Sequence, residues 1–167
     1  MSSLETFMTS ATVAGRSRPF EAILWGGLLA GIFDATYAMS MWALRGVSPD
    51  RVWQGVASGL LGPRSFQGGL RTAALGITIH FFIALTAATV YVTASRFLPV
   101  LRERAVLCGC LFGLLVWAFM RFVVIPLSLM RRSNASIFKW ELLGALAIHA
   151  FGVGLPIALN ARKFLGR

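Results

Sequence analysis

The chain has 167 residues, of which 57% are hydrophobic and 13% are charged, and its mean hydropathy is +0.74. This composition excludes a water-soluble globule and a disordered chain, and two cysteines exclude a disulfide-rich secreted scaffold. The net charge of +10 would point to nucleic acid in a soluble domain. Here the basic residues stand between apolar runs, where they hold helix ends at lipid headgroups. We therefore expect a membrane protein whose partner is the lipid bilayer, with no nucleic acid.

Four apolar stretches are long enough to cross a bilayer core about 30 Å thick, which takes about 20 residues of helix. They cover residues 21–44, 71–95, 105–126 and 140–161. We expect residues 1–20 to form a disordered polar segment, residues 21–163 the transmembrane domain, and residues 164–167 a tail. The first stretch is too long for the apolar region of a signal peptide, so we expect it to stay in the mature chain. The predicted fold is an all-α membrane protein with four transmembrane helices.

Four spans place both termini on the same side of the membrane. The basic residues are divided almost equally between the two sides. The terminal side carries them in the shorter segments, where the positive-inside rule has most weight. We therefore expect both termini in the cytoplasm.

A short helix is predicted between the first two spans, over residues 49–61. Ser48 can cap it, Pro49 fits the first turn, and Gly62 and Pro63 end it. Its apolar face is predicted to hold Val52, Trp53, Val56, Ala57, Leu60 and Leu61, and its polar face Arg51, Gln54 and Ser58. We expect this amphipathic helix to lie in the membrane interface, either as a connector that caps the bundle or as a lid or re-entrant element beside a pathway.

The spans also show a weak internal repeat. Each odd-numbered span opens with a Gly-x-x-x-Gly motif, and each even-numbered span carries one histidine. The residues are Gly27 and Gly31, Gly109 and Gly113, His80 and His149. This pattern is that of a duplicated helical hairpin with the interfacial helix inserted into the first copy. Close helix packing without duplication explains the same glycines, so both interpretations stay open.

Two stripes of small residues are expected to face each other across the first and second spans. The first stripe is Gly27, Gly31, Asp34, Ala38 and Met41, and the second is Gly76, His80, Ala84, Ala87 and Tyr91.

Three ionisable side chains fall near one depth by a rise of 1.5 Å per residue: Asp34, His80 and His149. Since a charge inside the bilayer costs at least about 2.5 kcal/mol, we expect them to form a buried polar cluster. The cluster could fix helix pairing, or it could relay protons or serve a solute pathway. It could also hold a cofactor, with His80 and His149 as axial ligands of a b-type haem or, with Asp34, as ligands of a divalent metal.

Arg121 is the fourth ionisable residue within a span. Its side chain either extends to the interface, forms an ion pair with Asp34, or contacts an anionic ligand.

Glu141 is placed to stabilise the amino end of the fourth span. Cys108 and Cys110 point to different faces of the third span and are interpreted as apolar fillers rather than a redox pair.

Several short segments, taken in their order along the chain, resemble a group of small bacterial inner-membrane proteins that are distantly similar to the YagU family. These segments are Gly27 to Gly31 with Asp34, the Ser48-Pro49 helix that ends in residues 57–62, residues 80–84 followed by Tyr91, and residues 123–128. The resemblance covers most of residues 22–163 and implies a four-helix protein of the inner membrane. It supplies no substrate, cofactor or catalytic residue, and the segments between the spans differ in length from those of YagU-type sequences.

No phosphate-binding loop, nucleophile elbow or metalloprotease motif is present in the sequence. We therefore expect a non-enzymatic accessory or assembly subunit that forms a homo-oligomer or joins a larger membrane complex. A small proton-linked transporter or permease is the alternative, and a haem or metal electron carrier is the third.

Overall fold

The computed structural model describes residues 18–130 and 139–166, and all regular structure in these residues is helical. Four helices are long and apolar enough to cross a membrane, as predicted: Pro19–Ala43, Gly69–Phe97, Ala105–Leu127 and Trp140–Leu165. The expected segment 1–20 lies mostly outside the described residues. The expected tail begins later than predicted, because the last helix continues to Leu165.

The first span is α2 (Pro19–Ala43) and the second is α4 (Gly69–Phe97), and both are continuous α-helices. The third and fourth spans are each interrupted by a π-helical segment. The third consists of α6 (Ala105–Phe119), the π-helical segment Met120–Val124 and α7 (Ile125–Leu127). The fourth consists of α8 (Lys139–Ala147), the π-helical segment Ile148–Gly154 and α9 (Leu155–Leu165).

Both π-helical segments end two residues before a proline, Pro126 in the third span and Pro156 in the fourth. A proline inside a helix lacks an N–H, and its ring clashes with the carbonyl four residues earlier. Those carbonyls belong to Phe122 and Gly152, which both lie inside the π-helical segments. The wider turns thus accommodate the prolines without ending the spans.

The predicted short helix is observed as α3 (Pro49–Leu61). It is followed by a 3₁₀ turn, Gly62–Gln67, and Gly62 has a positive φ of 61° that suits glycine. The two predicted faces do not correspond to a buried side and an exposed side. The side chains buried in the protein are Gln54, Ala57 and Ser58, whereas Leu60 and Leu61 are exposed.

The reason is that α3 packs closely on α4. A Cβ at Gly76 would collide with the backbone carbonyl of Trp53, so only small or compact side chains fit at this contact. Gln54 is held there because its amide donates a hydrogen bond of 3.0 Å to the carbonyl of Gly69. Leu60 and Leu61 are exposed at the end of α3, where they can face lipid.

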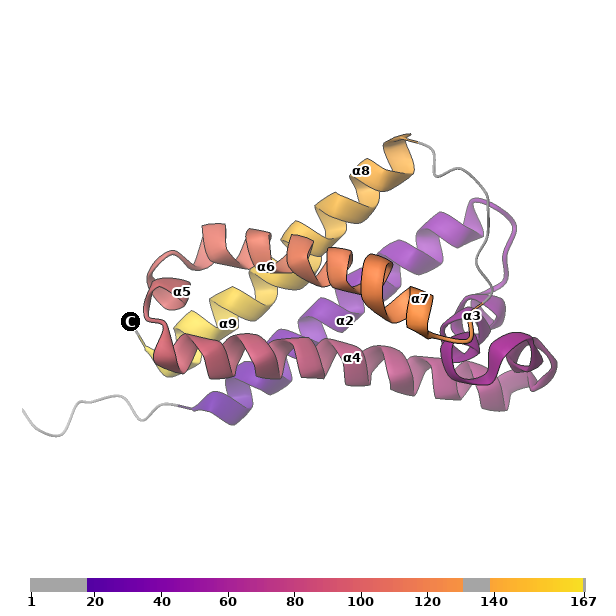
Figure 1. Ribbon diagram of the computed structural model, residues 1–167, viewed down its shortest axis with the longest axis horizontal. Coiled ribbons are helices and arrows are strands. Elements are labelled where there is room, and N and C mark those ends of the chain that lie inside the picture. Colours follow the sequence, from indigo (N-terminus) through magenta and orange to yellow (C-terminus); the bar gives the residue numbers. More distant parts are fainter. Residues whose placement is uncertain (1–17, 131–138, 167) are drawn as a thin grey trace, which may run out of the picture.

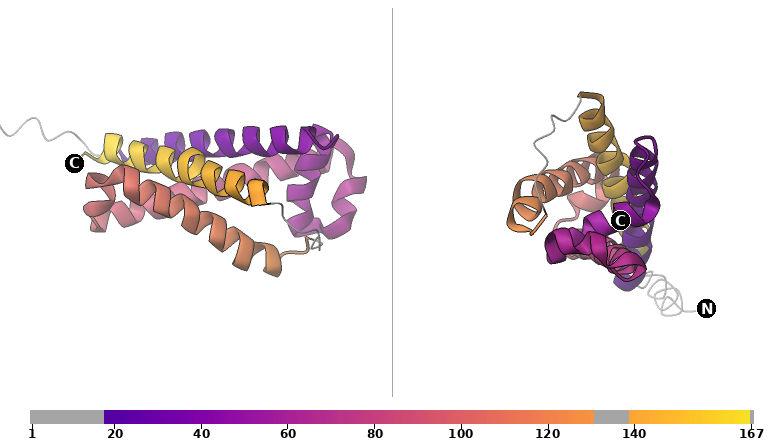
Figure 2. Two further views of the ribbon diagram at one scale, coloured as in Figure 1. Left: turned by 90° about the horizontal axis from the view of Figure 1, so that it is seen from above. Right: turned by 90° about the vertical axis from the view of Figure 1, so that its right-hand side faces the viewer.

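The fourth span is the centre of the bundle. It runs between α2 and the third span (Figure 2, left), and α9 packs on α2, α6 and α4. The third span packs on the fourth rather than on α4. In its most apolar 18-residue stretch, only 6% is buried inside the protein, against 33% in that of the fourth span. The third span is therefore the peripheral one, and it crosses in front of the fourth span in the ribbon (Figure 1).

The described ends of the chain meet at one end of the bundle, where the backbone N–H of Arg18 donates to the carbonyl of Phe164 at 2.8 Å. The core beside this end is built mainly from small side chains, with Tyr91 and Ile157 as its largest members. Its alanines are Ala22, Ala30, Ala88, Ala105, Ala158 and Ala161. Small residues allow the helix backbones to approach closely, which is the usual basis of helix association in lipid.

Candidate functional site

His80 joins three helices at one point. Its Nε2 donates a hydrogen bond of 2.9 Å to the carbonyl of Gly31 on α2. The imidazole also makes edge contacts with Trp53 of α3, at 5.5 Å between ring centroids, and with Phe81 beside it on α4, at 5.3 Å. The histidine on the second span is therefore satisfied by a backbone carbonyl and two aromatic rings.

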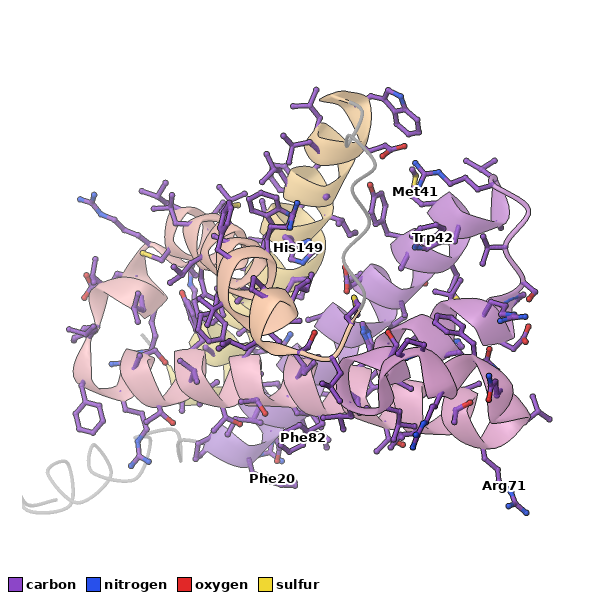
Figure 3. The ribbon with its side chains drawn as sticks, turned by 45° about the vertical axis from the view of Figure 1, so that its right-hand side comes forward. Phe20, Met41, Trp42, Arg71, Phe82 and His149 are labelled. Atoms are coloured by element: carbon purple, nitrogen blue, oxygen red, sulfur yellow. The ribbon has the colours of Figure 1, made fainter. Side chains whose placement is uncertain are left out.

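His149 is satisfied in a different way. Its Nδ1 donates a hydrogen bond of 2.9 Å to the carbonyl of Ala145, one turn earlier on the same span. Its own backbone carbonyl faces Gly113 on α6. Figure 3 shows His149 on the fourth span near α6.

The predicted buried cluster of Asp34, His80 and His149 is wrong. No hydrogen bond joins any two of these side chains, and the described residues contain no group of three or more His, Cys, Asp or Glu side chains that could hold a metal ion. Depth along the membrane was the basis of the prediction, but depth does not fix direction. One imidazole bonds to the neighbouring helix and the other bonds back along its own helix.

The ion pair expected as one alternative for Arg121 is also not found. Arg121 is exposed, and the ion pairs of the described residues join Arg18 to Glu21 and Arg45 to Glu141. Asp34 is half-buried and has no cation within ion-pair distance in this part of the chain. Both charges thus stand within spans without an opposite charge supplied by the described residues.

The Gly-x-x-x-Gly motif of the first span packs on α4, as its small-residue stripe predicts. A Cβ at Gly27 would touch Leu85 and Ala84, and one at Gly31 would press on the ring of Phe81. The facing stripe of α4 is only partly correct. Gly76 packs on α3 instead of α2.

The motif of the third span makes a close backbone contact with the fourth span, as close as that of Gly76 with Trp53. A Cβ at Gly113 would collide with the carbonyl of His149, and one at Gly154 would collide with the carbonyl of Gly109. At Gly113 backbone lies against backbone, whereas the nearest atom to a Cβ at Gly109 is the small side chain of Ala158. All four motif glycines are therefore used inside the bundle.

Tyr91 does not face the first span, as its predicted stripe required, but contacts the third span and the connection before it. It is 1% exposed, and its hydroxyl donates a hydrogen bond of 2.8 Å to the carbonyl of Leu101 in the connection to the third span. Its ring meets the ring of Phe112 on α6 edge to face, at 5.0 Å between centroids. This aromatic pair bridges α4 and α6 near the terminal end. Cys108 and Cys110 are both free thiols.

One ion pair was not predicted from the sequence. The guanidinium of Arg45, after the end of α2, contacts the carboxylate of Glu141 at the start of α8. The two residues are 96 positions apart in the sequence, so no local pattern links them. The available signal was their opposite charge at span ends on the same side of the membrane.

Comparisons with protein-family models, curated proteins and solved structures found no match to this chain. The resemblance to YagU-type proteins therefore stays a prediction.

Proposed function

We propose that this multi-pass membrane protein is a non-enzymatic accessory subunit that assembles with other membrane-embedded chains. The observation that carries the proposal is Arg121, an exposed arginine within the third span that has no carboxylate partner in the described residues. An arginine inside the hydrocarbon costs at least about 2.5 kcal/mol, so a partner that neutralises it gains binding energy.

The surroundings of Arg121 support an assembly role. It lies six residues before the end of the third span at Leu127, which is about 9 Å of helix. Phe119 and Phe122 are exposed beside it. A cation within an apolar face suits a partner helix that carries a carboxylate at the same depth.

The glycine motifs are not available for contact with another chain. Gly27, Gly31, Gly109 and Gly113 are buried in contacts within the chain, so another chain has to bind a different surface. The peripheral third span offers that surface, since a smaller share of its most apolar stretch is buried than in the other three spans.

The test is chemical cross-linking in native membranes, with mass-spectrometric identification of the linked chains. We expect the wild type to cross-link to itself or to another membrane protein, Arg121→Leu to lose the product, and Arg121→Lys to keep part of it. The matched control is Arg71→Leu, which removes an exposed arginine that points away from the bundle at the start of α4 (Figure 3). Cross-linking that persists in Arg121→Leu would contradict the proposal and show that the Arg121 side chain extends to the membrane interface without binding a partner chain.

Proton-linked transport is a second candidate, and Asp34 is the observation that favours it. Asp34 stands fifteen residues after the first residue of α2 and nine before its last, so its short side chain cannot reach either interface. It is half-buried and has no cationic partner in the described residues. A carboxyl group in such a position can take up and release a proton.

Proteoliposomes with an imposed pH gradient separate the two candidates. Transport predicts a proton flux that Asp34→Asn abolishes and that Glu103→Gln, an exposed acid outside the spans, leaves unchanged. The assembly proposal predicts no flux from either variant or from the wild type.

We also propose that the chain lies in a bacterial inner membrane with both ends in the cytoplasm, as the resemblance to YagU-type proteins and the positive-inside rule favour. The terminal end carries Arg96, Arg102, Arg104, Arg162 and Lys163 in short segments. A Gly166→Cys variant, with both native cysteines replaced by alanine, tests the orientation. A membrane-impermeant maleimide should label it in inside-out vesicles and not in right-side-out vesicles.

A further inference from the structure

An apolar groove of about 270 Å³ lies between α4 and α6 near the terminal end of the bundle. Val90 and Ala94 form one wall and Leu111 and Leu115 the other. The groove follows from the packing described above: the third span leans on the fourth, so the second and third spans are bridged here by side chains.

The floor of the groove offers no free polar group. It is formed by the edge-to-face pair of Tyr91 and Phe112, and the Tyr91 hydroxyl is already bonded to the carbonyl of Leu101. The walls are aliphatic, and Val90, Leu111 and Leu115 are each more than half exposed. Such a surface suits an apolar chain and excludes a polar solute.

The groove ends at a cluster of positive charge. The connection from Arg96 to Arg104 holds three arginines and one acid, Glu103, which gives it a net charge of +2. Arg104 precedes Cys108, Leu111 and Leu115 by four, seven and eleven residues, so it stands on the same face of the helix as the groove.

Arg104 is the charge that a ligand in the groove can use. It is exposed and forms no ion pair with another described residue. Arg96 is exposed too, but it follows Tyr91 by five residues and Ala94 by two, which places it on the other side of α4 from the groove. Arg102 is already engaged, since its guanidinium donates to the carbonyls of Leu165 and Gly166 at 3.4 and 3.3 Å.

The distance from Arg104 to the inner end of the groove matches one leaflet of a bilayer. Arg104 and Leu115 are eleven residues apart, which is about 16 Å of helix, and half of a hydrocarbon core is about 15 Å. A chain anchored beside Arg104 would thus reach the bilayer midplane near Leu115.

We infer that this groove is a binding site for an anionic phospholipid, with one acyl chain against Tyr91 and Phe112 and the phosphate beside Arg104. Basic residues at the end of a groove between membrane helices attract anionic headgroups, each contributing about 1 kcal/mol. The inference is independent of the assembly proposed for Arg121, because it uses the opposite end of the third span.

Native mass spectrometry of the detergent-purified full chain tests the site. The probes are phosphatidylglycerol and phosphatidylcholine with the same acyl chains. We expect the wild type to retain phosphatidylglycerol in preference, and Arg104→Gln to weaken its binding about fivefold, which corresponds to about 1 kcal/mol. The matched control Arg71→Gln removes an exposed arginine at the other end of α4 and should leave retention unchanged.

A second variant tests the acyl-chain part. Ala94→Trp fills the groove and should reduce retention of both lipids, whereas Ala74→Trp, at an exposed position near the far end of α4, should not. Equal retention of the two lipids by the wild type would overturn the proposal. So would a loss in Arg71→Gln as large as that in Arg104→Gln. Arg104 is exposed, so its variant keeps the test decisive even if Ala94→Trp fails to fold.

Discussion

The two helical hairpins of this protein use the same sequence motif to make different contacts. In the first, α2 and α4 meet through Gly31, and the His80 side chain crosses between the helices to bond to the Gly31 carbonyl. In the second, Gly113 faces the backbone of His149, whose side chain bonds within its own span. A Gly-x-x-x-Gly motif therefore specifies close approach, and what fills the contact depends on the opposite helix.

The prolines explain part of the difference. Only the second hairpin has a proline within each span, and both of its spans carry a π-helical segment there. The segment in the fourth span includes His149 and Gly154, so the contact with Gly109 and Gly113 is made by a widened turn. At Gly31 of the first hairpin, whose helices are unbroken, an added Cβ would instead meet the ring of Phe81.

The largest effect is expected from Gly113→Ala. The added Cβ collides with the His149 carbonyl, and backbone cannot move aside as a side chain can. Overpacking of this kind costs about 3 kcal/mol of unfolding free energy. Unfolding by SDS in mixed micelles measures the loss, with Gly55→Ala as the control because a Cβ there meets no atom within 4 Å. Equal stability of the two variants would contradict the backbone contact.

Gly31→Ala should cost less, about 1 kcal/mol, in the same assay. Its Cβ presses on the Phe81 ring, which can rotate away. If Gly31→Ala proved as damaging as Gly113→Ala, the two hairpins would be packed alike and the contrast between them would be lost.

The two histidines should also differ when removed. His80→Ala breaks a hydrogen bond between two spans, and such bonds contribute about 0.6 kcal/mol on average. His149→Ala removes a bond within one span and should leave the helix pairing intact. Thermal unfolding in detergent would compare them. A larger loss for His149→Ala would point to a contact of its ring that the structure does not contain.

The ion pair of Arg45 and Glu141 links the first hairpin to the second. Because Arg45 is 39% exposed, solvent screens the pair, and we expect a coupling of about 0.5 kcal/mol. A double-mutant cycle with Arg45→Gln and Glu141→Gln measures it. The coupling should fall as salt is raised, and a coupling unaffected by salt would indicate a pair shielded from water.

The smallest effect concerns α3, the helix that only the first hairpin contains. A hydrogen bond from the Ser48 side chain holds the pKa of Asp50 below its ordinary value of 3.8, and nearby backbone N–H groups act in the same direction. A lowered pKa means that this stabilisation is complete above pH 3.8 and is lost as pH falls through the folded value. NMR shifts of the first turn should therefore change in acid. Asp50→Asn should remove that change, and an unaltered acid response would assign it elsewhere.

Sequence reasoning predicted the parts of this fold that depend on local patterns. The spans follow from apolar length, and the bounds of α3 follow from Pro49 and Gly62. Ser48 precedes the helix, but its side chain makes no capping hydrogen bond. Its buried face could not be predicted from hydrophobicity, because Leu60 is exposed while the hydrogen-bonded Gln54 packs inward.

The predicted polar cluster failed for a related reason. The depth of Asp34, His80 and His149 can be calculated from the sequence, but the direction of each side chain depends on helix rotation. That rotation is set by distant glycine contacts and by the π-helical turn that holds His149. The arginine and glutamate that do pair, Arg45 and Glu141, come together only because α2 and the fourth span are neighbours.

The position of the fourth span beside the first is the central structural claim, and disulfide trapping tests it most directly. A Cβ at Gly26 would lie 3.6 Å from the Cβ of Asn160, which suits a disulfide. With Cys108 and Cys110 replaced by alanine, we expect the pair Gly26→Cys and Asn160→Cys to cross-link within one chain in native membranes. The pair Gly26→Cys and Leu115→Cys, which reaches to the peripheral third span, should not. Cross-linking of the second pair but not of the first would contradict a bundle centred on the fourth span.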